Sequence, residues 1–215
     1  RTAGKARRGR QEIRGREVKY LLPLLVLLPV ASQAYTFETH ACAKPGMRCG
    51  IVRVPENYSK PDGRKIALTV VVLPATEGPN RKVAQYDFEG GPGFAVTESA
   101  TFYATDGAAY HRTRDVVLAD QRGTGASHPL RCSKIEEHDR QRPVRPMYPV
   151  KLVKDCAATL SRDSDLTQYT TANSARDVDA IRQVFGYEQL SLNALSYGTT
   201  LALRYIADFG DHVHS

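Results

Sequence analysis

The sequence predicts an α/β fold in which a mostly parallel β-sheet carries helices on both faces. Three observations support this prediction. Short apolar segments alternate with helical ones along residues 50–215, two of these segments end in glycine-rich turns, and a third ends at a serine that a helix follows at once. Strands that alternate with helices favour parallel pairing, because each helix carries the chain back across the sheet.

Four segments before that serine are expected to be strands, because they are short, apolar and mostly rich in β-branched residues. They are residues 50–55, 65–73, 83–88 and 115–119. A helix is expected over 171–185, where apolar side chains recur every three or four residues, and Gly186 is expected to end it. Residues 126–150 are rich in proline and arginine, so we expect them to cross the surface.

The serine lies in the run Leu190-Ser-Leu-Asn-Ala-Leu-Ser196-Tyr-Gly-Thr-Thr-Leu-Ala-Leu203, between an expected strand (190–193) and an expected helix (199–209). This pattern is typical of a nucleophile elbow, a sharp turn that exposes a serine oxygen. Ala194 and Gly198 are small enough for helix and strand to pack closely. Ser196 is therefore the candidate nucleophile. The backbone N–H of Tyr197, at the helix N-terminus, is a candidate donor to an oxyanion.

Two glycine-rich segments precede the elbow: Glu89-Gly-Gly-Pro-Gly93 and Asp120-Gln-Arg-Gly-Thr-Gly125. The first stands where the loop that gives the second oxyanion donor belongs, and its glycines let the backbone approach a substrate. The second lacks the Lys-Ser/Thr pair of a phosphate-binding loop and reads alone as a solvated turn. The order and spacing of both segments with the elbow indicate one catalytic scaffold.

The N-terminal residues are expected to form an export signal, and they also explain the net charge of +7. Residues 1–19 hold eight basic residues and two acidic ones, so the positive charge gives no support for nucleic-acid binding. An apolar run over 20–31, of about 12 residues, is too short to span a bilayer and suits a signal peptide. Ser32-Gln-Ala34 then offers a cleavage site.

These observations divide the chain into a basic leader and signal peptide, residues 1–34, and the N-terminal part of a catalytic domain, residues 35–215. Translation could begin at Val18 if an alternative start codon encodes it. The alternative for the apolar run, a buried helix, conflicts with Pro23 and Pro29. We therefore expect a secreted or periplasmic protein without a stable membrane span.

The four cysteines, Cys42, Cys49, Cys132 and Cys156, agree with export. Three pairings are open, of which the local one is the most economical, and four free thiols in a cytoplasmic protein are the alternative. No cysteine or histidine cluster has zinc-binding spacing, so neither a metal nor another cofactor is expected.

Several segments together resemble a known family. The segments are Val54-Pro-Glu-Asn-Tyr58, Glu89–Gly93, Asp120–Ser127, Pro129-Leu-Arg-Cys132, Tyr169-Thr-Thr171, Ala175–Asp179 with Ile181-Arg182, Gly186-Tyr187 and Ser196-Tyr-Gly-Thr199. In these segments the chain is similar to the N-terminal half of secreted α/β-hydrolases of the prolyl iminopeptidase and tripeptidyl aminopeptidase group of serine peptidases. The resemblance implies that Ser196 is the nucleophile, that Gly91 and Tyr197 form the oxyanion hole, and that Cys132 pairs with Cys156.

The chain departs from this family at two points. The family elbow commonly reads Gly-Gly-Ser-Tyr-Gly, whereas Ala194 and Leu195 precede the serine here. The family's catalytic Asp and His, and the cap that recognises the substrate N-terminus, would lie beyond Ser215. None of the six histidines is expected to replace that base, and Asp177 and Asp179 are expected to be surface or packing residues. We therefore expect a domain truncated after the helix that follows the elbow, without a complete triad.

The predicted function is that of an exported serine hydrolase acting on peptide substrates. It would release residues from peptide N-termini by acyl transfer through Ser196. Two alternatives stay open: an esterase or lipase-like enzyme on the same scaffold, and a secreted binding protein that has the fold without the activity.

Overall fold

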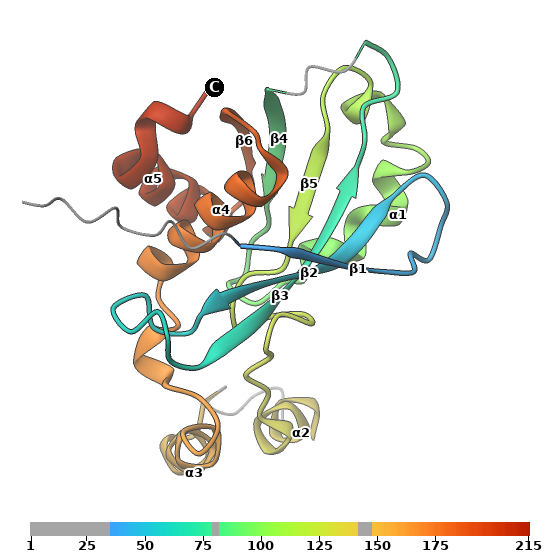
Figure 1. The fold of residues 1–215 in the computed structure, drawn as a ribbon. Coiled ribbons are helices and arrows are strands. Elements are labelled where there is room, and N and C mark those ends of the chain that lie inside the picture. Colours follow the sequence, from blue (N-terminus) through green and yellow to red (C-terminus); the bar gives the residue numbers. More distant parts are fainter. Residues whose placement is uncertain (1–34, 79–81, 142–147) are drawn as a thin grey trace, which may run out of the picture. The chain divides into compact units, whose positions relative to one another are not determined.

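The computed structural model describes residues 35–78, 82–141 and 148–215 (Figure 1). The leader predicted over residues 1–34, with its proposed start at Val18, lies outside the described residues. Within the described part no helix is both long and apolar enough to cross a bilayer.

The described strands form a single sheet with the order β1-β2-β3-β5-β4-β6. Their bounds are β1 (Phe37–His40), β2 (Arg48–Pro55), β3 (Lys65–Leu73), β4 (Val83–Phe88), β5 (Val116–Ala119) and β6 (Gln189–Ala194). The sequence predicted β3 and β4 with these bounds, and each of the other predicted strands differs by one or two residues in total. It missed β1, a short strand whose residues are mostly exposed.

The sheet is mixed in the described residues, so the expectation of a mostly parallel sheet needs correction there. The pairs β1–β2, β2–β3 and β3–β5 are antiparallel, whereas β4 pairs in parallel with both β5 and β6. The difference follows from the connections. The short turn between β2 and β3 can only join antiparallel neighbours, whereas parallel neighbours need a crossover, such as the one through α4 (Thr171–Phe185) that leads to β6.

Helices cover both faces of the sheet, as the sequence predicted (Figure 1). Helix α4 and helix α5 (Tyr197–Phe209) pack on one face, where the larger core includes Leu68, Ile181 and Tyr205. The short helix α1 (Ala100–Tyr103) and the 3-10 turn before it cover the other face. Both layers are needed because the central strands are apolar on both sides.

Helix α4 begins and ends where the sequence predicted. The Thr170 side chain accepts a hydrogen bond from the Asn173 N–H at 3.3 Å, which caps the first turn. At the other end Gly186 has a left-handed backbone, with φ of 72°, and its N–H returns to the last carbonyls of the helix.

The segment expected to cross the surface contains more regular structure than the sequence predicted. Helix α2 (Ser133–Gln141) forms inside it, and helix α3 (Val150–Leu160) follows. A disulfide between Cys132 and Cys156 joins the start of α2 to α3, and a second disulfide joins Cys42 to Cys49. The local pairing of the four cysteines is therefore the one in the structure. The mixed-polarity surface of α2 gives no clear apolar period, which is why its sequence suggested a loop.

Candidate active site

The register of two parallel strands brings the glycine-rich loop to the candidate nucleophile. In the β4–β6 pair Phe88 stands opposite Ala194, so Gly90 and Ser196 each follow two residues later at the same edge of the sheet. A Cβ placed on Gly90 would lie 2.8 Å from the Ser196 Cβ and 3.3 Å from its Oγ. After β4 the chain leads to β5 on one side of β4, and after β6 it leads to Val213, which bridges to Leu190 of β6. Open α/β sheets bind ligands where the connections of two neighbouring strands diverge in this way.

Ser196 has the backbone of a nucleophile elbow. Its φ of 52° and ψ of −122° are rare for a residue with a side chain, and the residue is exposed. Strand β6 ends at Ala194 and helix α5 begins at Tyr197, so the chain turns from strand to helix around this serine. Strain of this kind costs about 1–3 kcal/mol, and it persists at sites where the surrounding structure enforces it.

The residues around the serine explain how the turn fits. A Cβ on Gly198 would lie 2.5 Å from the carbonyl oxygen of Phe88, so only glycine lets α5 approach β4 this closely. Leu195, which replaces a family glycine, leaves 64% of its surface exposed and therefore meets no obstruction in the described residues. The first helical residue, Tyr197, has a backbone N–H without an intrahelical acceptor. In the described part of the chain this N–H therefore lies at a helix N-terminus beside Ser196, a position that favours negative charge.

The histidines with described hydrogen bonds are engaged away from Ser196. The side chain of His40 bonds to Ala41 O, that of His111 to Pro74 O, and that of His128 to Ser164 Oγ. The backbone N–H of His214 donates to Leu190 O near the start of β6. The end of that strand is roughly 13 Å from Leu190 at the usual rise per residue, and Ser196 lies beyond that end. His214 therefore sits at the wrong end of the strand to act as the base.

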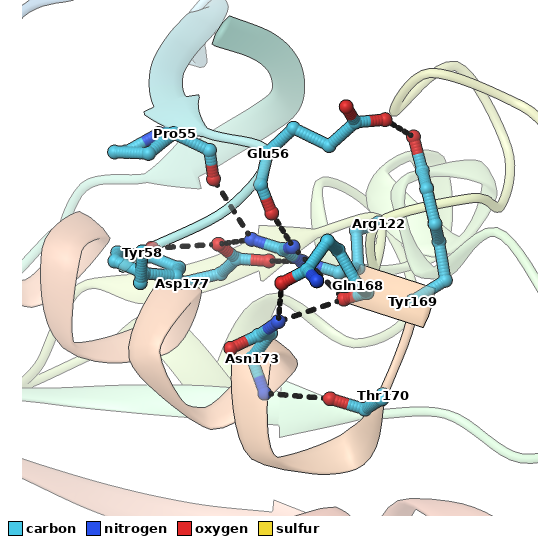
Figure 2. Close-up of polar contacts among 9 residues, drawn as sticks. All are labelled: Pro55, Glu56, Tyr58, Arg122, Gln168, Tyr169, Thr170, Asn173 and Asp177. Carbon is cyan, nitrogen blue, oxygen red and sulfur yellow. Dashed lines mark hydrogen bonds and ion pairs between the residues drawn. The ribbon is translucent and has the colours of Figure 1, made fainter. Parts of the chain in front are cut away.

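Arg122 in the second glycine-rich segment is a structural centre that the sequence did not reveal. Its guanidinium is fully buried and donates to both carboxylate oxygens of Asp177 in α4, at 2.6 and 2.7 Å (Figure 2). It also donates to the carbonyl oxygens of Glu56 at 2.8 Å and Gln168 at 3.1 Å. A solvated turn was one interpretation that the sequence left open for this segment, and the buried guanidinium excludes it for this residue. Asp177 is a packing residue, as expected, with a partner that the sequence could not name.

The other polar residues of the segment are also satisfied inside the fold. The Asp120 carboxylate accepts from the Thr97 N–H at 3.0 Å and the Ala126 N–H at 3.1 Å, and the Ser127 hydroxyl accepts from the Thr69 N–H at 2.8 Å. Asp179, likewise buried, accepts from Arg182 at 2.7 Å. These side chains of the segment are therefore held by contacts inside the fold.

Another buried carboxylate, Asp87, lies on β4, the strand that leads to the glycine-rich loop. Asp87 accepts hydrogen bonds from the Tyr103 hydroxyl and from Gln85 Nε2, the latter at 2.8 Å. Burial raises the pKa of Asp87 above its ordinary value, although the hydrogen bond from Gln85 acts in the opposite direction. The folded state therefore favours the protonated carboxyl more than the unfolded chain does.

We expect the Asp87→Asn variant of the full-length protein to gain stability relative to the wild type as the pH rises from about 4. The wild-type carboxyl loses its proton in a buried place as the pH passes its raised pKa, whereas asparagine does not titrate. Urea unfolding of both proteins across this range measures the difference. A difference in unfolding free energy that does not change with pH would contradict the assignment.

Comparison with known proteins agrees with this geometry. A family model described as alpha/beta hydrolase fold matches residues 88–215. The chain is 31% identical over 185 residues to a tripeptidyl aminopeptidase of Streptomyces lividans, an alignment that covers 78% of this chain and 34% of the relative. It is 30% identical over 186 residues to the serine protease Hip1 of Mycobacterium tuberculosis, with 79% and 35% covered.

A solved proline iminopeptidase from Mycobacterium smegmatis is also similar, with a TM-score of 0.47, 17% identity, and coverage of 76% of this chain and 41% of that one. The chain spans about a third of the length of the curated relatives it matches. The protein belongs to the α/β-hydrolase fold family. The names of its relatives confirm the expected resemblance to aminopeptidase-like serine hydrolases.

Proposed function

We propose that the protein is an exported serine hydrolase that releases residues from peptide N-termini through an acyl-enzyme on Ser196. The observation that carries this proposal is the exposed Ser196 in its strained turn, with Gly90 of the glycine-rich loop against its side chain. A backbone held in this conformation beside free N–H groups is suited to nucleophilic attack on a carbonyl. The relatives named above, a tripeptidyl aminopeptidase and a serine protease, favour a peptide as the substrate.

The reaction would proceed by acyl transfer. Ser196 Oγ bonds to the carbonyl carbon of the scissile peptide while its proton passes to a base, which the family resemblance places after Ser215. The N–H groups of Tyr197 and Gly91 would stabilise the negative oxygen that forms. The carbon–nitrogen bond then breaks, the amine leaves with the proton, and water hydrolyses the ester that remains on Ser196.

The proposed export is consistent with the two disulfides. Disulfides persist in oxidising compartments such as the periplasm and the medium, and the structure pairs Cys42 with Cys49 and Cys132 with Cys156. The leader proposed over residues 1–34 would supply the signal for transport.

A substrate comparison tests the proposed activity. The full-length protein is assayed on aminoacyl and tripeptidyl nitroanilides with free N-termini, on their N-acetylated counterparts, and on a simple ester. An aminopeptidase-type enzyme cleaves the free-amine substrates and spares the acetylated ones. Cleavage of the ester alone would favour the esterase alternative, and no turnover of any substrate would favour the binding protein.

Replacing Gly91 with alanine in the full-length protein is expected to lower kcat by roughly 10²-fold, because it displaces a donor from the developing charge. Gly91 has φ of 107°, and a Cβ there would lie 2.7 Å from the Gly93 nitrogen. Gly46→Ala is the matched control, since Gly46 has φ of 83° in open space. Steady-state kinetics and thermal unfolding of both variants separate the effects. If kcat fell by a similar factor in both variants, the loss would come from backbone strain and not from a displaced oxyanion donor.

A further inference from the structure

The side chain of Tyr197 links the elbow to the helix that precedes it in the fold. Its hydroxyl lies 2.8 Å from the Thr171 hydroxyl, so the two groups share a hydrogen bond. Tyr197 is the first residue of α5 and Thr171 is the first residue of α4. Both residues are half-buried. One side chain therefore ties together the starts of the two helices that cover this face of the sheet.

The turn at Ser196 has few other ties to the fold. The Thr199 N–H and hydroxyl donate to the Ser196 carbonyl at 3.0 and 2.6 Å, and the Gly198 N–H donates to Leu195 O at 2.8 Å. These bonds are local, so they fix the shape of the turn but not its direction. In the described part of the chain, the turn is tied to other elements by the Leu195 N–H, which donates to Phe88 O at 3.0 Å, and by the Tyr197 hydroxyl.

The Thr171 end of this link is itself held in place. Thr170 caps α4, and the buried Asn173 side chain donates to the Gln168 carbonyl oxygen at 2.9 Å. The same oxygen accepts from Arg122 at 3.1 Å (Figure 2). The start of α4 is thus anchored to the buried Arg122. Arg122 is in turn anchored to the end of β2 by its hydrogen bond to the Glu56 carbonyl oxygen. Thr171 gives Tyr197 a fixed partner and not a mobile one.

We infer that the Tyr197 hydroxyl is a positioning group that aims the Tyr197 backbone N–H at the oxyanion. The inference rests on the proposed function, since it concerns the same reaction. The hydroxyl does not need to touch the substrate. It limits rotation of the first turn of α5, and a small misdirection of a donor costs a large factor in rate, because the donor must meet a charge that exists only in the transition state.

The test compares variants of the full-length protein on an ester and its matching thionoester. A thiocarbonyl sulfur accepts hydrogen bonds poorly, so hydrolysis of the thionoester depends less on the oxyanion donors. Tyr197→Phe and Thr171→Val each break the link from one side. We expect each to lower kcat on the ester by roughly 10-fold with little change in KM, and to lower the ester-to-thionoester ratio of kcat.

Two further variants serve as controls. Thr171→Ser keeps the hydroxyl and should recover most of the ratio that Thr171→Val loses. Tyr187→Phe removes another tyrosine hydroxyl that bonds across the fold, in this case to Asp115 at 2.6 Å, without touching the elbow or the contacts of Arg122. It should lower the melting temperature and leave the ratio at its wild-type value.

The outcomes separate this inference from the proposed function. An unchanged ratio in Tyr197→Phe, or equal losses on both substrates together with a lower melting temperature, would overturn the positioning role. Labelling of the wild type by an organophosphonate is measured in the same preparations. A wild type that is not labelled at Ser196 would overturn the proposed function and this inference with it, whereas a labelled wild type with an unaffected Tyr197→Phe would overturn the inference alone.

Discussion

Replacing Ser196 with alanine in the full-length protein is expected to lower turnover by at least roughly 10⁴-fold and to abolish labelling by an organophosphonate. Ser196 has the exposed side chain and the strained backbone of the elbow, and without its oxygen no acyl-enzyme can form. Turnover is measured on the substrate that the wild type prefers, and labelling by mass spectrometry of the modified peptide.

Ser191→Ala is the matched control for this substitution. Ser191 lies in β6, the strand that leads to Ser196, but is buried and bonded to Arg114 at 2.8 Å, so its loss should affect stability more than chemistry. Labelling that survives Ser196→Ala would place the nucleophile elsewhere. A Ser196→Ala protein that melts well below the wild type would show that the residue acts through the fold.

Breaking the buried pair of Arg122 and Asp177 is expected to give a large loss of stability. Both side chains are almost wholly buried, with 0% and 6% of their surface exposed. Removing one partner leaves the other charge buried without compensation, which costs about 3–5 kcal/mol. We therefore expect Arg122→Met to lower the free energy of unfolding of the full-length protein by about that amount, as measured by urea denaturation.

A surface pair of similar geometry gives the control. Arg53 and Glu38 also approach within 2.7 Å, but about half of each side chain is exposed. Water and salt screen such a pair, so Arg53→Met should cost far less. Asp177→Asn, which keeps the shape and removes the charge, tests the same point if Arg122→Met does not fold. Equal effects of Arg122→Met and Arg53→Met would refute a special role for the buried pair.

The predictable parts of the fold depend on local signals. The helix bounds at Thr171 and Phe185 could be predicted because an apolar period and Gly186 lie within one short stretch. The elbow at Ser196 could be predicted for the same reason, since strand, serine and helix follow one another directly. Its pairing with the loop at Gly90 followed from order and spacing along the chain.

The remaining features depend on contacts between distant residues, which local patterns do not encode. Arg122 reads as one more polar residue in a glycine-rich turn, yet its partners lie 46 to 67 residues away in the sequence. The link between Tyr197 and Thr171 likewise joins two helices whose own patterns do not require it. Whether β3 runs parallel or antiparallel to β5 depends on where the chain re-enters the sheet. Hydrophobic patterning does not specify that position.

The register of β4 against β6 has a consequence for how this protein can vary during evolution. Because Gly90 and Ser196 meet only when Phe88 stands opposite Ala194, inserting a single residue in either strand would move the loop past the serine and turn the following side chains to the other face. Helices α2 and α3 lie in the chain between β5 and α4, outside both strands, so a change of length there leaves the register of β4 against β6 intact. Insertions and deletions tolerated by selection should therefore gather between Cys132 and Cys156, while the two strands keep their lengths.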